Sequence, residues 1–222
     1  HFPVAVRTEG TELLRRKGDA KLFPYLTAAG RERFLAGIDV SAHQQTVDWE
    51  KVAAAGVKFA MIRVGYRGCG TGKIVEDDYA RENLRDALHA GLEVGVYFFS
   101  QATCRAEAVA EAYYVAAVLE EYKDRITMPV VFDWEETGNE NARTKDLSGE
   151  TVTDCAMYFT DVIREAGYEP AVYFNRHMGY YLYSSAEGYD IVREVNSPNV
   201  RLLFDIYHQQ IMEGYLIANL SA

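Results

Sequence analysis

The sequence predicts an α/β protein in which strands and helices alternate, with a (β/α) barrel of the TIM type, in modified form, as the leading architecture. Three times a helix-forming stretch ends in Ala-Gly and continues into an apolar run, with the glycines at Gly56, Gly91 and Gly167. Glycine just beyond a helix adopts the left-handed conformation that closes it. The apolar runs that follow are typical of parallel strands buried on both faces. The pattern therefore favours a parallel sheet connected through helices.

Strands are expected in chain order with helices between them. The strand centres lie near Ile38, Ile62, Val96, Phe132, Val172 and Leu203. The helices are expected over residues 48–55, 77–90, 105–122 and 149–166. Successive strand centres lie about 25 to 40 residues apart, which is the length of a βα unit. These strands are fewer than the roughly eight of a closed barrel, so other segments must supply the rest.

The first 35 residues are expected to form an N-terminal cap or extension on a single barrel domain that spans residues 1–222. Within this segment, residues 3–7 and 22–26 are expected to form a hairpin-like cap over one end, with glycine-containing turns between them. If the segment adds no strands, the barrel stays open, and an open barrel favours a homo-oligomer. At 222 residues, of which 49% are hydrophobic, the chain can bury a sizeable core.

Two carboxylates end one of the apolar runs and form the most informative feature of the chain. The run from Pro129 to Glu136 carries Asp133 and Glu135 at positions i and i+2. Because the side-chain period of a strand is two, both acids project from one face. Burying such a pair costs free energy, so a functional role for the acids is expected. Cleavage of a glycosidic bond uses a pair of carboxyl groups, of which one donates a proton and the other stabilises or activates. The alternative is a strand end with two solvated or salt-bridged acids.

Asp39 adds a third acid, inside the apolar run Ala36–Ser41 of the first expected strand. In βα barrels the catalytic residues lie at the carboxyl ends of strands, where Asp39, Asp133 and Glu135 would meet at one mouth. Like charges gathered there raise at least one pKa, which keeps a carboxyl protonated near neutral pH. An N-cap or a salt-bridged barrel acid is the alternative for Asp39.

Several polar and aromatic residues at strand ends are candidates for contact with a sugar. Tyr66, Tyr97 and Tyr173 lie at strand ends and offer a ring face together with a hydroxyl. Packing in the core is their alternative role. Asn175 and Arg63 are weaker candidates. Their alternative role, about equally expected, is hydrogen bonding that supports the structure.

Five motifs, in matching order and spacing, resemble those of the glycoside hydrolase family 25 lysozymes. They are Gly37–Ser41, Asp48–Trp49, Phe59–Tyr66, Gly91–Ser100 and Pro129–Glu135, and Val172–Asn175 is similar to the next strand. The resemblance covers about residues 36–183. It implies a β-1,4-N-acetylmuramidase that cleaves the bond between MurNAc and GlcNAc in the peptidoglycan glycan strand, on a modified βα barrel, outside the cell and without cofactor or metal.

The resemblance also implies roles for the three acids. Glu135 would be the proton donor. Asp133 would stabilise the charged intermediate or orient the acetamido group of the substrate. Asp39 would be the supporting acid of the first strand. The family pattern includes a late Trp-Gln-Tyr strand and a terminal active-site Asp, and neither is found in this sequence.

Residues 185–222 instead resemble the hydroxypyruvate isomerase group of sugar-isomerase barrels. In that group the Asp and His of a Phe-Asp-x-Tyr-His strand end, here Asp205 and His208, lie at a divalent-metal and substrate site. Two barrel families joined in one chain imply an engineered or recombined chimera, with reduced or absent lysis as an alternative to full activity. A metal-dependent sugar isomerase is a further alternative, although the rest of that barrel is absent. The isomerase-like segment is expected to add one helix, over 186–195, and one strand, over 200–205, following the strand at 171–174.

Charge and hydropathy exclude other classes of function. The net charge is −10 and no basic stripe is visible, which argues against nucleic acid. No run of about 18 apolar residues suggests a membrane span. The chain begins at His1 without a signal peptide, as expected of a processed or trimmed protein.

Overall fold

The computed structural model describes residues 4–8, 34–175, 190, 193–196 and 203–205. They fall into two units, each described by itself. The elements of the first unit are β1 (Val4–Thr8), β2 (Phe34–Val40), α2 (Trp49–Ala54) and β8 (Leu203–Asp205). The elements of the second unit are η1 (Ala42–Gln44), β3 (Phe59–Arg67), β4 (Ile74–Glu76), α3 (Ala80–His89), β5 (Glu93–Ser100), α4 (Arg105–Leu119), η2 (Glu120–Arg125), β6 (Ile126–Glu135), α5 (Gly149–Glu165) and β7 (Pro170–Asn175).

In the first unit, β1 pairs antiparallel with β2 on one side and with β8 on the other. Ala5 stands opposite Gly37 in the first pair and opposite Asp205 in the second. Gly37 lies so close to the ring of Phe59 that a Cβ at this position would sit 2.2 Å from a ring carbon. The Gly-Ile-Asp motif thus needs its glycine for close packing.

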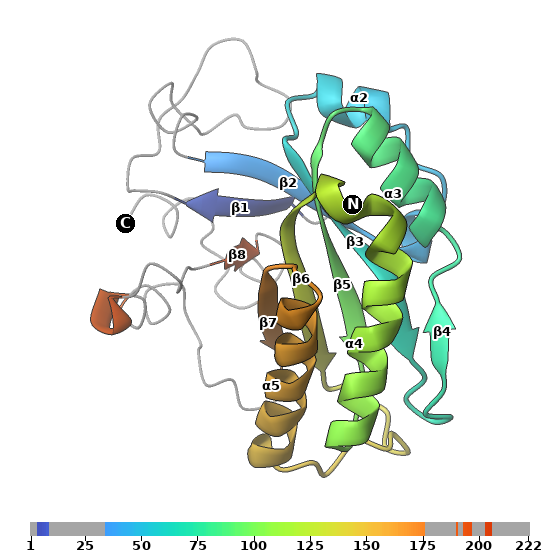
Figure 1. The fold of residues 1–222 in the computed structure, drawn as a ribbon, viewed down its shortest axis with the longest axis vertical. Helices are drawn as coiled ribbons and strands as arrows, with labels where there is room; N and C mark the ends of the chain where they lie inside the picture. The colour runs from blue at the N-terminus through green and yellow to red at the C-terminus, as the bar shows by residue number, and fades with distance from the viewer. Residues whose placement is uncertain (1–3, 9–33, 176–189, 191–192, 197–202, 206–222) are drawn as a thin grey trace. The chain divides into compact units, whose positions relative to one another are not determined.

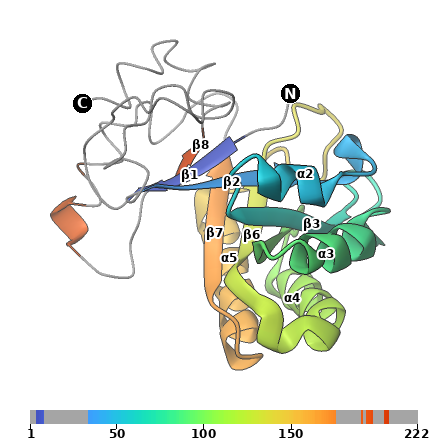
Figure 2. The same cartoon turned by 90° about the horizontal axis from the view of Figure 1, so that it is seen from above.

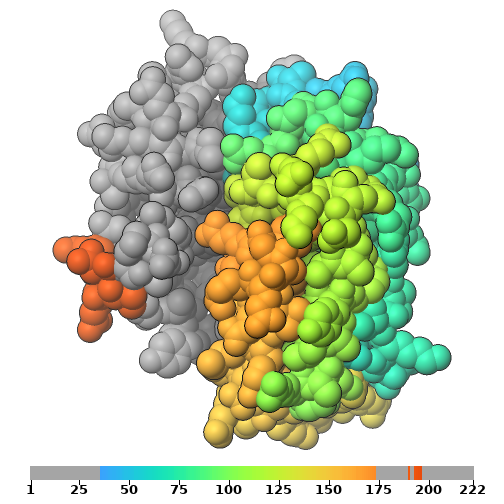
Figure 3. All heavy atoms as spheres, in the orientation of Figure 1, coloured from blue at the N-terminus to red at the C-terminus, as the bar shows by residue number. Residues whose placement is uncertain are grey.

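In the second unit, a mainly parallel sheet has the strand order β7-β6-β5-β3, and β4 pairs antiparallel with β3. Both β5 with β6 and β6 with β7 are parallel pairs. Helices α3, α4 and α5 lie on one face of these strands (Figures 1 and 2). Figure 3 shows α4 and α5 side by side on this face, in yellow-green and orange.

Aromatic side chains join the sheet to its helices. Phe98 on β5 packs edge-on against Tyr114 on α4, with ring centroids 5.8 Å apart. Phe132 on β6 meets Phe159 on α5 at 5.3 Å. Phe98 and Phe132 are fully buried, and burying each phenyl ring contributes about 1.5–3 kcal/mol. Since side chains alternate along a strand, the neighbours of these phenylalanines point to the opposite face of the sheet.

The strands and helices expected over residues 36–175 are confirmed, and the chain has a parallel α/β sheet fold. Every predicted strand centre that lies in the second unit falls inside a strand, and the helices begin and end within a few residues of the expected bounds. Gly56, Gly91 and Gly167 have φ values of 98°, 78° and 90°, as their role of closing helices requires. Closure of the barrel and the single domain over 1–222 stay predictions.

The structure corrects one expectation about the chain ends. The N-terminal strand forms and pairs with β2, and residues 22–26, its expected hairpin partner, lie outside the described residues. The strand Leu203–Asp205 was expected to follow β7 in parallel, and instead it runs antiparallel to β1. With β2 along one side, β1 still has a free edge of backbone N–H and C=O groups, and β8 satisfies them. Residues 190 and 193–195 are helical, in line with the expected helix over 186–195.

Candidate active site

Strand register places three of the predicted residues of the second unit, Tyr97, Asp133 and Tyr173, on one face of the sheet. Asp133 on β6 stands in register with Phe99 on β5 and with Tyr173 on β7. Tyr97 is in register with Val131, two residues before Asp133. Partnered residues of parallel strands point to the same side of the sheet. Tyr97, Asp133 and Tyr173 therefore lie on the face opposite α4 and α5.

The two acids of β6 differ in their exposure. Asp133 is 7% exposed, whereas Glu135, at the last position of the strand, is half-buried. The backbone of Glu135 stands in register with Asn175, the last residue of β7. The pair thus consists of a deep acid flanked by aromatic residues and a shallower acid at the carboxyl edge of the sheet. A shallow acid can reach a bound substrate while the deep acid supplies a fixed negative charge.

Arg63 and Tyr66 lie on β3 in the same unit, and the guanidinium carbon of Arg63 is 5.4 Å from the centre of the Tyr66 ring. Arg63 Nε also donates to Asp77 Oδ2 at 2.8 Å, in an ion pair whose carboxylate is fully buried. Asp77 accepts further bonds from the backbone N–H groups of Ala42 and Tyr79. Asp77 thus links Arg63 on β3 to the backbone of Ala42 and Tyr79, and contact of Arg63 with a sugar stays a prediction.

The remaining predicted residues belong to the first unit or lie outside the described part of the chain. Asp39 is half-buried near the end of β2, in the first unit. Its place beside Asp133 and Glu135 stays a prediction. Asp205 is the last residue of β8, and His208 lies outside the described residues.

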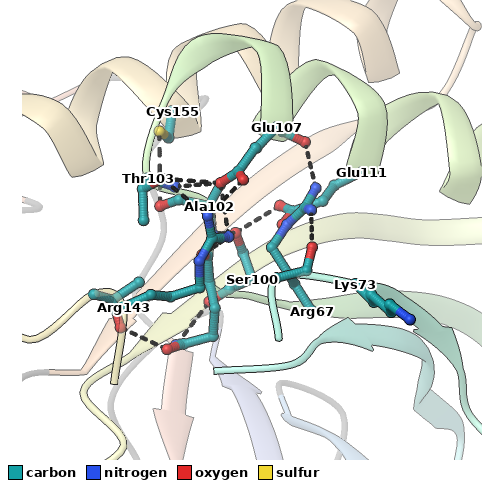
Figure 4. A network of polar contacts seen from close by, with 12 residues as sticks. Arg67, Lys73, Ser100, Ala102, Thr103, Glu107, Glu111, Arg143 and Cys155 are labelled. Atoms are coloured by element: carbon teal, nitrogen blue, oxygen red, sulfur yellow. Dashed lines mark hydrogen bonds and ion pairs between the residues drawn. The ribbon is translucent and has the colours of Figure 1, made fainter. Parts of the chain in front are cut away.

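A buried polar network lies where β3 and β5 meet the first turns of α4 (Figure 4). Arg67 Nε donates to Glu111 Oε1 at 2.5 Å, and the Ser100 hydroxyl donates to Glu111 Oε2 at 2.6 Å. Arg67 also donates to the backbone carbonyls of Gly72 and Glu107. Burial raises the pKa of Glu111 to about 7, against the lowering effect of the hydrogen bonds from Ser100 and Arg67. A charge pair in this position ties two strands to one helix.

Arg143 extends the network into the loop after β6. Its guanidinium donates to both carboxylate oxygens of Glu107, at 2.9 and 2.7 Å (Figure 4). Its backbone N–H donates to the carbonyl of Cys69. Burial alone would raise the pKa of Glu107, but hydrogen bonds from Arg143 and Thr103 hold this pKa below its ordinary value. The bidentate pair fixes this loop to the start of α4.

Sequence reasoning missed this network, although one signal for it was present. Ala108, Ala112 and Val115 form a buried stripe on α4, and Glu111 falls within the stripe. An acid at a core position of a helix predicts a buried cationic partner. No such local signal identifies Arg67 as that partner, because the two residues are 44 positions apart.

The described part of the chain holds neither a cluster of metal ligands nor a helix suited to a membrane. Among these residues, no three His, Cys, Asp or Glu side chains gather closely enough to hold a metal ion. None of the helices described is both long and apolar enough to cross a membrane.

Comparison with known proteins relates the chain to cell-wall hydrolases. The model of the family described as Glycosyl hydrolases family 25 matches residues 38–189. Lysozyme M1 of Streptomyces globisporus is 30% identical over 99 residues, which are 45% of this chain and 32% of that protein. The chain thus spans about a third of the length of this curated relative.

Solved structures share the fold. The bacterial lysozyme from Streptomyces coelicolor is 26% identical at a TM-score of 0.51, over 63% of this chain and 62% of that one. The modular autolysin LytC from Streptococcus pneumoniae is 21% identical at a TM-score of 0.56 and was solved with a synthetic peptidoglycan ligand. That match covers 74% of this chain and 38% of that one.

Proposed function

We propose that this chain, which belongs to family 25 of the glycosyl hydrolases, hydrolyses peptidoglycan as an N-acetylmuramidase. The bond cleaved is the β-1,4 bond between MurNAc and GlcNAc, and the partner is the glycan strand of a cell wall outside the cell. The observation that carries the proposal is the pair Asp133 and Glu135, which lies on one face of β6 inside the matched residues. The lysozymes among the similar proteins support the same class of substrate.

In this proposal Glu135 is the general acid. Its position at the last residue of β6 suits transfer of a proton to the glycosidic oxygen as the bond from that oxygen to the MurNAc anomeric carbon breaks. Water then adds to that carbon through its oxygen and releases one proton, and the return of a proton to the Glu135 carboxylate restores the acid. Asp133, deeper in the same face, stays ionised and stabilises the positive charge on the sugar or orients its acetamido group. Asp39 supports the pair as a third acid.

The aromatic residues beside the acids form the proposed sugar-binding surface. Tyr97 and Tyr173 lie on the strands that flank β6, and Tyr66 lies on β3. Tyrosine offers an apolar ring to a sugar face and a hydroxyl to its polar groups. Asn175 and Arg63 are assigned weaker contacts with the glycan strand.

We further propose that the C-terminal segment lowers the rate of hydrolysis. The family model ends at residue 189, and residues 185–222 resemble a different barrel family. The strand β8 from this segment pairs with β1 rather than extending the parallel sheet beyond β7. Side chains selected for another core seldom interlock, at a cost of roughly 1–3 kcal/mol for each misfitted contact.

The test is replacement of Glu135 by Gln, with Glu136→Gln as the matched control. Both glutamates are half-buried neighbours, but successive side chains of an extended chain point to opposite sides. We expect Glu135→Gln to lower the turnover of purified peptidoglycan by about 10²- to 10⁴-fold, because the acid is lost while its shape is kept. Glu136→Gln should keep most of the activity. Release of reducing ends measures turnover, and reduction followed by mass spectrometry identifies the sugar at each new end.

Circular dichroism must show that both variants are folded. Near-normal turnover by Glu135→Gln would remove Glu135 from the mechanism. New ends that carry GlcNAc rather than MurNAc would assign the chain to a different bond.

A further inference from the structure

We propose that the side-chain amide of Gln101 is a clamp that positions Glu135 for proton transfer, with Thr144 as its partner. The inference rests on the proposed function, because it takes Glu135 as the acid. It assigns a role to two buried residues, Gln101 and Thr144, that lie outside the strands and helices. Both are positioning residues and act through the backbone of Glu135.

Both the nitrogen and the oxygen of the Gln101 side-chain amide make hydrogen bonds. Gln101 directly follows β5 and has no exposed surface. Its Nε2 donates to the carbonyl of Ser100 and to the carbonyl of Glu135, each at 2.9 Å. Its Oε1 accepts from the Thr144 hydroxyl at 2.6 Å, and Thr144 is 2% exposed. An amide carries donors on one atom and an acceptor on the other, so these partners fix its orientation.

The clamp holds both ends of one segment. Glu135 is the last residue of β6, and the chain forms neither strand nor helix from residue 136 until α5 begins at Gly149. Gln101 holds this segment at its start through the Glu135 carbonyl and near its end through Thr144. The strand end that carries the proposed acid is thereby tied to the end of β5, next to Ser100 of the buried network.

Other contacts hold the same segment and should keep it folded when the clamp is weakened. Arg143 pairs with Glu107 through two hydrogen bonds and donates from its backbone to Cys69. Its Nη1 also reaches the backbone carbonyl of Gln101 at 3.4 Å. None of these Arg143 contacts involves the Thr144 hydroxyl. The hydroxyl can therefore be removed while the contacts of Arg143 stay.

A small displacement of the strand end changes the rate more than the binding of substrate. A misplacement of about 1 Å in a reacting group can cost on the order of 10²-fold in rate. The hydrogen-bond partners of the amide are the carbonyls of Ser100 and Glu135 and the hydroxyl of Thr144, and none of these residues is a proposed sugar-binding tyrosine. Loss of the clamp should therefore lower kcat and leave KM nearly unchanged.

Thr144→Val is the primary test, with Thr144→Ser as the conservative variant and Thr153→Val as the matched control. Valine has the shape of threonine but cannot donate to Gln101, whereas serine can. Thr153 is exposed on α5, and its hydroxyl donates to the backbone carbonyl of Gly149. Gln101→Met, which removes the amide at similar length, is the second variant if Thr144→Val does not fold.

Two readouts are needed: kcat and KM on soluble glycan chains of alternating MurNAc and GlcNAc, and amide hydrogen exchange of peptides covering residues 135–147. For Thr144→Val we expect kcat to fall about 10- to 100-fold, KM to stay within about twofold, and exchange over 135–147 to become faster. Thr144→Ser should restore both values, and Thr153→Val should resemble the wild type.

The outcomes separate the clamp from the proposed function. A wild-type chain that releases no ends overturns the proposed function, and exchange still decides whether the clamp exists. Unchanged exchange over 135–147 in folded Thr144→Val and Gln101→Met overturns the clamp. An active wild type with unchanged kcat in folded variants overturns the positioning of Glu135. A rise in KM at constant kcat would also overturn it.

Discussion

Glu111 is an acidic residue at a buried position of α4, and such a residue requires buried partners that donate hydrogen bonds to it. The side chain is fully buried on the inner stripe of α4, and two donors, Arg67 and Ser100, use its two carboxylate oxygens. Removing one member of a buried ion pair costs about 3–5 kcal/mol, because the other charge is left without compensation. Glu111 thus connects α4 to β3 through Arg67 and to β5 through Ser100.

We expect stability to depend on pH through Glu111. Burial raises the pKa of this carboxyl from 4.5 to about 7 in the folded protein, whereas the unfolded chain titrates at the ordinary value. Its contribution to stability is therefore fully present below about 4.5 and is lost as the pH rises through about 7. The free energy of unfolding should fall by on the order of 1–3 kcal/mol across this window. Denaturant titrations at closely spaced pH values measure it.

Glu111→Gln is the comparison for this pH series. The variant has no carboxyl to titrate, so its free energy of unfolding should change less between pH 4.5 and 7. Equal pH dependence in the two proteins would show that other groups cause it.

At the scale of elements, register decides what the β6 acids can do. The period of two puts Asp133 and Glu135 on one face, and parallel pairing brings Tyr173 and Phe99 beside Asp133. Helices α4 and α5 occupy the other face through Phe98 and Phe132. A shift of one residue in the pairing of β6 would turn both acids towards the helices. Packing of the helices therefore fixes the direction in which the acids point.

The end of the loop after β6 depends on the cap of α5. Ser148 precedes this helix, and its hydroxyl accepts from the Thr151 backbone N–H at 3.1 Å. We expect Ser148→Ala to lower the free energy of unfolding by about 1 kcal/mol, because one donor of the first turn loses its partner. Ser148→Asp should keep the stability, since aspartate caps equally well and favours the helix dipole. Chemical denaturation measures all three proteins, and an unchanged Ser148→Ala would contradict the cap.

For the whole molecule, we expect the proposed hydrolysis to proceed without a metal ion. Asp133 has Phe99 and Tyr173 as its neighbours in register, and neither is a ligand of the kind that tight transition-metal sites use. The proposed function needs only a proton donor and a fixed charge. The metal-dependent isomerase alternative instead requires Asp205 and His208 to share an ion with further ligands.

We expect the release of reducing ends from peptidoglycan to continue unchanged after treatment with a strong chelator and removal of the chelator by dialysis. Metal analysis of the treated protein confirms that the treatment worked, and a zinc-dependent hydrolase treated in parallel is the positive control. Loss of activity that is restored by a divalent cation would contradict the prediction and would favour a metal site.

The sequence alone determined the features that depend on local pattern. Helix ends at Gly56, Gly91 and Gly167, the alternation of strands and helices, and the shared face of Asp133 and Glu135 all follow from backbone conformation and side-chain period over a few residues. These features suffice for the fold class. The family motifs are local as well, because each lies on one strand with its adjoining turn or at the start of a helix.

Tertiary structure decided what depends on partners far apart in the chain. Nothing local in Leu203–Asp205 indicates that β1 is its neighbour, since any free strand edge offers the same hydrogen-bonding groups. Arg67 meets Glu111, and Gln101 meets Glu135 and Thr144, only after β3, β5 and β6 have paired and α4 has packed on them. Such contacts are selected by the packing of the whole unit, because each polar group must find a partner once water is excluded.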